Sequence, residues 1–217
     1  MATSPYNALT DSKALAEVLG PTEGSAVWIK QAILFVAGIA ALTLAAQIKI
    51  PVPPSPVPVN LGTLAVLTIG AAYGPRLGLL TIIGYMILGA TGLDIFANSS
   101  ATSNGLAYMA GTTGGYLVGY VLATLYLGWA ARRALDRTVE GMCGSMLVAN
   151  VLIYVPGLLW LGYLIGHGLF KPEQYESVAA QTFAWGLTPY IIGDLLKLAV
   201  AALLVPTVWK LVGKARK

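Results

Sequence analysis

The segment "PYIIGDLLKLAVAALLVPTVW", residues 189–209, is long enough to cross a lipid bilayer as a helix and is almost wholly apolar. About 20 apolar residues suffice for such a span, so this segment belongs in a membrane. It nevertheless carries Asp194 and Lys197. An ionisable side chain near the middle of a membrane helix costs roughly 2.5 to 3.5 kcal/mol on insertion scales, so it usually faces a cavity or a partner.

The rest of the chain repeats this apolar character. Only 10% of the 217 residues are charged, whereas soluble domains contain about 25%. Dividing the chain at charges and at Pro and Gly clusters predicts an all-α integral membrane protein of six transmembrane helices, near residues 31–50, 60–75, 77–93, 106–131, 140–166 and 185–212. The second and third are short and are separated only by "GPR" at residues 74–76, which favours a helical hairpin.

The distribution of Lys and Arg predicts the orientation. With six spans both termini lie on one side, which receives ten basic residues against two on the other, Lys49 and Lys171. The positive-inside rule therefore places both termini in the cytoplasm. We expect residues 1–29 to form a polar cytoplasmic tail and residues 30–217 the membrane domain. Within the tail, "DSKALAEVLG" favours a short surface helix with Asp11 as its cap.

Three connections then face outward, at residues 49–60, 94–105 and 167–181. The first has five prolines in twelve residues and should be a stiff, extended strut. The second is rich in Asn and Ser, whose side chains both donate and accept hydrogen bonds, and we expect it to act as a polar lid.

Asp194 and Lys197 are three residues apart, so they share a helix face, which Tyr190 joins one turn earlier. Pro189 and Gly193 should distort the outer end of this helix, which places the pair in the outward half of the membrane. The pair either locks two helices together or meets a ligand, with Lys197 on an anionic or carbonyl group and Asp194 on N–H donors. We favour the ligand.

Two stripes of small residues predict close helix contacts. Gly111, Gly115 and Gly119 favour packing, although the stretch from Gly111 to Gly115 also offers backbone N–H groups at a helix start. The second stripe, in the first span, either packs inside the protein or docks another subunit. It consists of Ala37, Ala41 and Ala45.

Several classes of function are disfavoured by missing residues. "CGSM" at residues 143–146 resembles the setting of a serine nucleophile, but no second motif supplies a base. "VGKARK" lacks the first glycine and the hydroxyl of a phosphate-binding loop, so the chain cannot hydrolyse ATP alone. Basic residues flank apolar segments instead of alternating with aromatic ones, which fits lipid headgroups and disfavours nucleic acid. Cys143 is the single cysteine and cannot build a thiolate metal cluster.

Five motifs resemble the substrate-binding S-component of energy-coupling-factor vitamin transporters, specifically the biotin-binding family. They are "AQIKIPVPPSPVPVNLGTLAV" from Ala46, "GPRLG" from Gly74, "GLDIFA" from Gly92, "GTTGGYLVGY" from Gly111 and "GDLLK" from Gly193. The resemblance implies a six-helix component in the plasma membrane, or in the inner membrane of an organism with two, that binds biotin as its transported substrate and uses no cofactor. It also implies a transmembrane coupling subunit, met through Ala37, Ala41 and Ala45, and two ATPase subunits.

The ligand site that the resemblance implies combines the "GDLLK" helix with the lid. Biotin carries a carboxylate and a ureido group, which complement Lys197 and Asp194 in either pairing. From the lid and its neighbours we predict Asn98 and Asn104 as polar contacts, with Phe96, Tyr108 and Tyr116 covering the ligand. Gly62 stands where the family usually has Gln. The alternatives are the same scaffold binding another vitamin, or an intramembrane enzyme dependent on Ser145.

Overall fold

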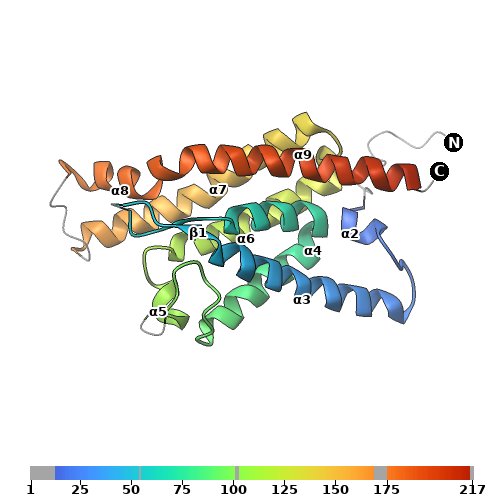
Figure 1. The fold of residues 1–217 in the computed structure, drawn as a ribbon, viewed down its shortest axis with the longest axis horizontal. Coiled ribbons are helices and arrows are strands. Elements are labelled where there is room, and N and C mark those ends of the chain that lie inside the picture. Colours follow the sequence, from blue (N-terminus) through green and yellow to red (C-terminus); the bar gives the residue numbers. More distant parts are fainter. Residues whose placement is uncertain (1–12, 54, 101–102, 169–174, 216–217) are drawn as a thin grey trace.

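The computed structural model describes residues 13–53, 55–100, 103–168 and 175–215, and these are mostly helical (Figure 1). The helices are α2 (Leu15–Val18), α3 (Ser25–Gln47), α4 (Gly62–Ala90), α5 (Gly105–Met109), α6 (Gly114–Arg132), α7 (Val139–Gly166), α8 (Val178–Gly186) and α9 (Ile191–Ala215). Two 3₁₀ turns, η1 (Leu135–Arg137) and η2 (Thr188–Tyr190), precede α7 and α9. Strands β1 (Lys49–Ile50) and β2 (Val59–Asn60) pair antiparallel, so the proline-rich connection runs between them as a narrow loop.

Five helical stretches in the described residues are long and apolar enough to cross a membrane, which identifies a membrane protein. One of them, α4, contains both the second and the third predicted segments. Its helix is broken at Gly74, whose φ of 74° is favoured by glycine. A Cβ placed on Gly78 would lie 3.8 Å from the Cα of Gly70, so the two halves of α4 pack against each other. The turn predicted at residues 74–76 is therefore present.

Glycines allow α6 and α7 to approach closely. A Cβ on Gly115 would lie 2.3 Å from the carbonyl oxygen of Pro156, and one on Gly119 would lie 2.6 Å from the Cα of Ile153. Neither position has room for a side chain, which confirms the packing role predicted for this stripe.

The N-terminal segment differs from the prediction. We expected a surface helix at residues 11–20, but α2 is a single turn whose preceding residue, Ala14, is fully buried. Ala14 packs against the break in α4, since a Cβ on Gly74 would lie 2.9 Å from its own Cβ. Glu17 pairs with Arg132 of α6. The expected cap, Asp11, lies outside the described residues, and α3 begins at Ser25, before the predicted start of the first span.

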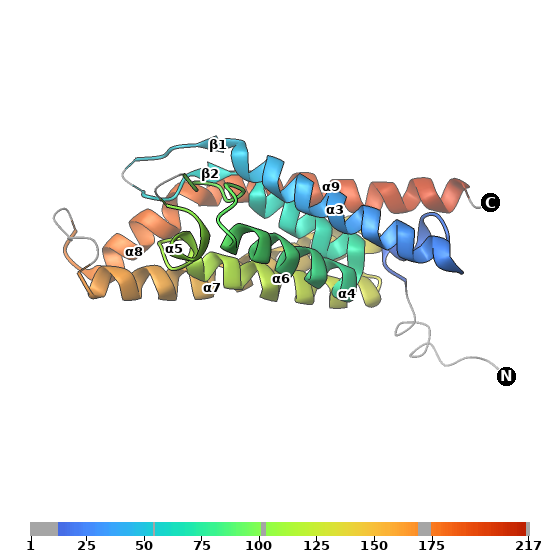
Figure 2. The same cartoon turned by 90° about the horizontal axis from the view of Figure 1, so that it is seen from below.

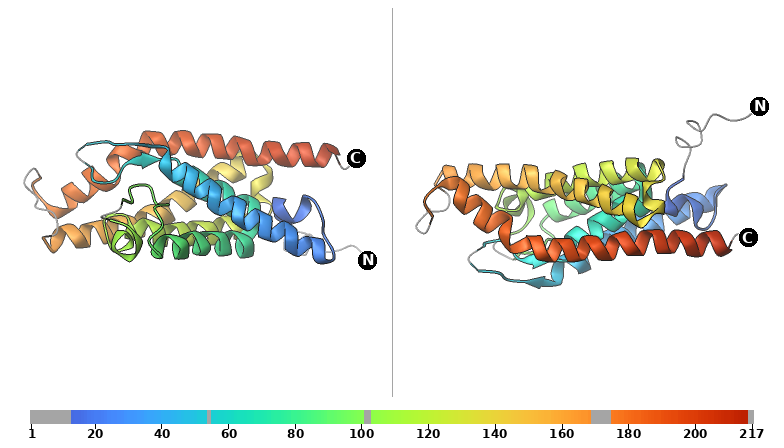
Figure 3. Two further views of the ribbon diagram at one scale, coloured as in Figure 1. Left: turned by 60° about the horizontal axis from the view of Figure 1, so that its bottom comes forward. Right: turned by 90° about the horizontal axis from the view of Figure 1, so that it is seen from above.

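Different elements lie at the two ends of the long axis of the molecule. In Figure 1 and Figure 3, α2, the start of α3 and the end of α9 lie at one end, which we call the basic end. Figure 2 shows the β1–β2 connection, α5 and α8 towards the opposite end. The chain between α8 and α9 bends at η2, where Pro189 lies, as predicted for the outer part of the last span.

Candidate functional site

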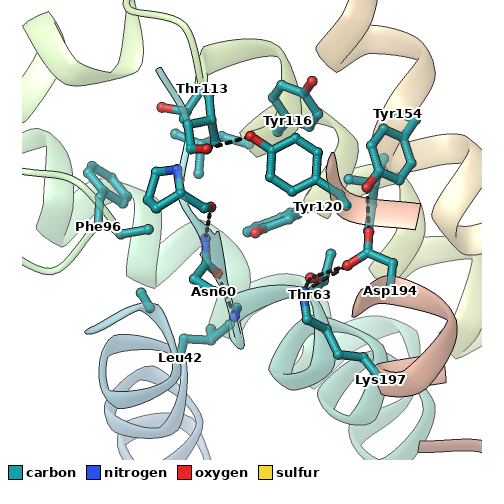
Figure 4. Close-up of a pocket in the computed structure, with 18 of the residues that line it drawn as sticks. Leu42, Asn60, Thr63, Phe96, Thr113, Tyr116, Tyr120, Tyr154, Asp194 and Lys197 are labelled. Atoms are coloured by element: carbon teal, nitrogen blue, oxygen red, sulfur yellow. Dashed lines mark hydrogen bonds and ion pairs between the residues drawn. The ribbon is translucent and has the colours of Figure 1, made fainter. Parts of the chain in front are cut away.

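A cavity of about 70 Å³ lies on the side of the helices away from the basic end. Residues from five long helices, α3, α4, α6, α7 and α9, line it together with residues of the β1–β2 connection and of the segment between α4 and α6 (Figure 4). The lining is mostly aromatic and aliphatic, with one acid and one base. The lining includes Asn60, Gly62, Thr63, Tyr85, Phe96, Tyr108, Tyr116, Tyr120, Tyr154, Tyr190, Asp194 and Lys197.

Asp194 and Lys197 form an ion pair at the wall of this cavity. Lys197 Nζ lies 2.8 Å from Asp194 Oδ1, and both residues are less than 10% exposed. Lys197 also donates to the hydroxyl of Thr63 on α4, at 3.1 Å. Tyr154 on α7 donates to the other carboxylate oxygen of Asp194, at 2.5 Å. A buried ion pair needs such added hydrogen bonds, because desolvation of the two charges offsets much of their attraction.

Aromatic rings form the opposite part of the wall. Phe96 stacks on Tyr108 with ring centroids 4.7 Å apart, and the edge of Tyr85 meets Phe96 at 5.3 Å. A Cβ on Gly89 would collide with the Phe96 ring at 2.0 Å, so glycine there makes room for it. Burial raises the pKa of the Tyr108 phenol, although hydrogen bonds with Thr113 and the Asn98 backbone oppose this shift. Its hydroxyl therefore remains protonated at neutral pH.

Hydrogen bonds fix both loops over the cavity. The Ser55 hydroxyl lies 2.7 Å from the carbonyl oxygen of Trp185 and 2.6 Å from the Tyr190 hydroxyl. Tyr190 also donates to the carbonyl of Val57, so the proline-rich connection is attached to η2. Gln47, at the end of α3, donates to the carbonyl of Phe96 at 3.2 Å and attaches the second loop.

The structure brings together five of the seven predicted ligand residues: Asp194, Lys197, Phe96, Tyr108 and Tyr116 all line the cavity. Asn98 and Asn104 do not. Asn98 is exposed, and Asn104 precedes α5 as its N-cap residue. Their polarity predicted a lid, but the side chain of the neighbouring Phe96 is the one that points inward.

Sequence reasoning missed Thr63, Tyr154 and Asn60. Each is a polar side chain at or within an apolar segment, and this polarity is the one sequence feature that could have identified it. Their convergence on one cavity, however, depends on how α4, α7 and α9 pack. Asn60 accepts a hydrogen bond from the backbone N–H of Gly62 at 2.7 Å. A Cβ on Gly62 would lie 2.7 Å from that same Asn60 oxygen, so glycine at this position leaves room for the Asn60 side chain.

The model of the BioY family matches residues 13–214, nearly the whole chain. The chain belongs to the BioY family. A relative from Pyrococcus horikoshii, named a probable biotin transporter BioY, is 31% identical over 166 residues, covering 76% of this chain and 88% of the relative. The biotin transporter BioY of Thermotoga maritima is 30% identical over 178 residues, covering 82% of this chain and 96% of the relative.

A solved structure confirms the fold of this BioY member. The crystal structure of an S-component for biotin from an ECF-type ABC transporter superposes with a TM-score of 0.71 at 18% identity. The match covers 87% of this chain and 95% of the other. The arrangement of α3 to α9 is therefore that of an S-component, and the resemblance inferred from the five motifs is confirmed.

Proposed function

We propose that this chain is the biotin-binding component of an uptake transporter, capturing biotin at the end of the molecule away from the basic end. The observation that carries this proposal is the ion pair of Asp194 and Lys197 facing a cavity lined by aromatic rings. Family membership and the names of the relatives support the same ligand.

The chemistry of the lining matches that of biotin. A ureido group offers two N–H donors and a carbonyl acceptor, and Asp194 and Lys197 can meet these with an acceptor and a donor. A carboxylate offers acceptors only, so it fits Lys197, Thr63 or a tyrosine hydroxyl. The apolar ring system and side chain of biotin fit against Phe96 and Tyr108. Both orientations of the ligand satisfy these rules.

The cavity is small for this ligand. Its volume of about 70 Å³ is below the roughly 300 to 1,000 Å³ of most ligand pockets. The helices on its far side are held by the glycine contacts of α6 and α7, whereas the loops are held by a few hydrogen bonds. We therefore propose that the described parts of the loops that follow β1 and Phe96 open to admit biotin and close again over it.

We also propose six passes through the membrane, counting the two halves of α4 separately, with the basic end in the cytoplasm. Lys30, Arg76 and Arg132 all lie at that end, which is what the positive-inside rule requires. Lys171, Arg216 and Lys217 lie outside the described residues. The membrane is the plasma membrane, or the inner membrane where there are two, and residues 30–217 form its membrane domain.

The exposed alanine stripe of α3 indicates where a partner subunit could bind. Ala37 and Ala41 are exposed and Ala45 is half-buried, which favours a docking surface over packing inside the protein. We propose that this stripe meets a transmembrane coupling subunit, which in turn carries ATPase subunits. The chain itself has no phosphate-binding loop to power transport.

A titration of the purified full-length protein with biotin, monitored by calorimetry, tests the ligand. We expect saturable binding of one biotin per chain, and weaker binding of biotin methyl ester if the carboxylate is recognised. Thiamine and riboflavin serve as controls for the alternative that the scaffold binds another vitamin. Absence of biotin binding by folded protein that binds one of these controls would overturn the proposal.

The remaining alternative was an intramembrane enzyme dependent on Ser145. Its hydroxyl donates to the carbonyl of Gly141 one turn earlier, at 2.8 Å, and Ser145 is not among the residues that line the cavity. The relatives are named as transporters. The chain is a transport component.

A further inference from the structure

A second cavity, of about 590 Å³, lies at the basic end between α2, α3 and α4. Four cationic side chains line it, those of Lys13, Lys30, Arg76 and Arg132, against one carboxylate, that of Glu17. The described lining therefore has a formal charge of +3. This cavity is larger than the one beside Asp194 and does not share a residue with it.

The four cationic side chains differ in their hydrogen-bond and ion-pair partners. Arg132 pairs with Glu17. Among the described residues, Lys30 Nζ donates only to neutral groups, the carbonyl oxygens of Leu19 at 3.1 Å and of Pro21 at 2.7 Å. Arg76 is exposed, and its guanidinium has no hydrogen-bond or ion-pair partner within the part of the chain that the structure describes. Arg76 and Lys30 thus have positive charge that no described carboxylate balances.

The cavity changes from charged to apolar along the helices. On α4, Arg76 is followed one turn later by Leu80, which is 58% exposed, and on α3 Lys30 is followed one turn later by Leu34. Trp28, 75% exposed, also lines the cavity, and tryptophan is enriched at the interfaces between membrane and water. A polar, positive end beside an apolar continuation matches a phospholipid, whose phosphate joins its acyl chains at the membrane surface.

We propose that this cavity binds an anionic phospholipid, with its phosphate between Arg76 and Lys30 and its acyl chains along Leu34 and Leu80. Basic pockets between membrane helices on the cytoplasmic side are suited to acidic headgroups. Arg76 supplies a planar pair of donors for phosphate oxygens, and Lys30 a point charge. Because α2 and the residues on both sides of the break in α4 line the cavity, the bound lipid would bridge the N-terminal segment to the first three spans.

The test is native mass spectrometry of the full-length protein in detergent, titrated with phosphatidylglycerol or phosphatidylcholine of identical acyl chains. We expect phosphatidylglycerol to bind at least about fivefold more tightly. Arg76→Gln and Lys30→Gln should each weaken its binding about tenfold, whereas Arg76→Lys should retain most of it. The matched control is Lys210→Gln, which removes an exposed charge of α9 at the same end but outside this cavity.

A substitution that fills the cavity without changing its charge distinguishes binding inside the cavity from general attraction of the lipid to a basic surface. Leu34→Trp fills the cavity and should also weaken phosphatidylglycerol binding at least about fivefold. Equal losses in Arg76→Gln and Lys210→Gln, with none in Leu34→Trp, would overturn the site. If millimolar glycerol phosphate competes with phosphatidylglycerol, the cavity binds a soluble anion, and the proposal of a lipid site is overturned.

Two further outcomes are decisive. If lipid binding is unchanged in all variants while co-purification with the coupling subunit falls, the cavity is a protein contact and the proposal is wrong. A variant that loses lipid binding counts only if it keeps the thermal unfolding midpoint of the parent. If Arg76→Gln unfolds, the lipid binding of Leu34→Trp and Lys30→Gln tests the proposal instead. None of these readouts depends on biotin.

Discussion

Lys197 Nζ lies 2.8 Å from Asp194 Oδ1, one helical turn away on α9, with Thr63 and Tyr154 completing the hydrogen bonds of the pair. The pair is thus held in place by side chains of the protein itself. This arrangement combines the two interpretations that the sequence left open, because the same contacts that lock α9 to α4 and α7 also orient both charges along the cavity wall.

We predict that Asp194→Asn and Lys197→Met each weaken biotin binding at least about tenfold, since losing a charged hydrogen-bond partner costs about 1.5 to 3 kcal/mol. Calorimetric titration measures the affinity. Lys210→Met, on the same helix but exposed and away from the cavity, is the control and should bind like the parent. If both cavity variants fold and bind normally, the pair is structural only.

We predict that Gly119→Ala destabilises the protein. Its new Cβ would lie 2.6 Å from the Cα of Ile153, so α6 and α7 must separate; overpacking of this kind costs roughly 1 to 3 kcal/mol. Gly144→Ala is a matched control, because a Cβ there has no heavy atom within 4 Å. Thermal unfolding in detergent should show a lower midpoint for the first variant and an equal or higher one for the second.

Asp136 gives a prediction for the dependence on pH. It is 1% exposed in η1, outside the spans, and burial raises its pKa, although Trp209 and Arg137 oppose the shift by interacting with the carboxylate. Between its ordinary value of 3.8 and the raised value, the folded state binds more protons than the unfolded state, so this group makes the protein more stable as pH falls.

Asp136→Asn removes this titration. The unfolding midpoint of the parent relative to that of the variant should therefore rise as pH is lowered through this window, and should be constant well above it. Thermal unfolding of both proteins across the range from neutral to mildly acidic pH measures the difference. A relative midpoint that falls on acidification would mean that the carboxylate is stabilised by its partners more than burial disfavours it.

The alanine stripe yields a prediction about transport. Ala41→Trp should leave biotin binding intact while lowering uptake in cells and co-purification with the coupling subunit, because a bulky ring would separate two closely packed helices. Ala40→Trp adds the same ring at the adjacent exposed position on α3, outside the stripe, and should have a smaller effect. Unchanged uptake of Ala41→Trp at normal protein levels would contradict the docking role.

Features set by local sequence were predictable. The break at Gly74 follows from a glycine and a proline between two apolar runs, and the shared face of Asp194 and Lys197 follows from their spacing. The approach of α6 to α7 follows from glycines spaced four apart. In each case the residues that determine the feature are neighbours in the chain.

Features that depend on packing between distant segments were not predictable. Tyr154 reaches Asp194 only because α7 and α9 lie side by side, and 40 residues separate them. Asn98 and Asn104 were chosen for their polarity, yet backbone geometry turns Phe96 inward and leaves Asn98 exposed. The single turn of α2 could not be predicted, because the burial of Ala14 requires the break in α4, which is formed by residues far along the chain.

The second loop gives the last prediction, and the structure sharpens it. We expected residues 94–105 to be poorly anchored, but Phe96 is 1% exposed, and Tyr85 donates to the carbonyl of Ile95 at 2.9 Å. The start of the loop is therefore fixed, whereas Asn98 and Ser100 after it are exposed. Because the cavity is small, the proposed binding of biotin requires the part of the loop after Phe96 to open and close again.

We therefore predict that biotin lowers hydrogen exchange across residues 94–116, most strongly after residue 97, since groups with few buried contacts exchange through local opening that a bound ligand suppresses. Exchange should change less in the middle of α7, which is the internal reference. Exchange measured with and without saturating biotin tests this. Equal exchange in both states would mean that the loop takes no part in closing the site, and Phe96 and Tyr108 would then lose their proposed role as the ligand's cover.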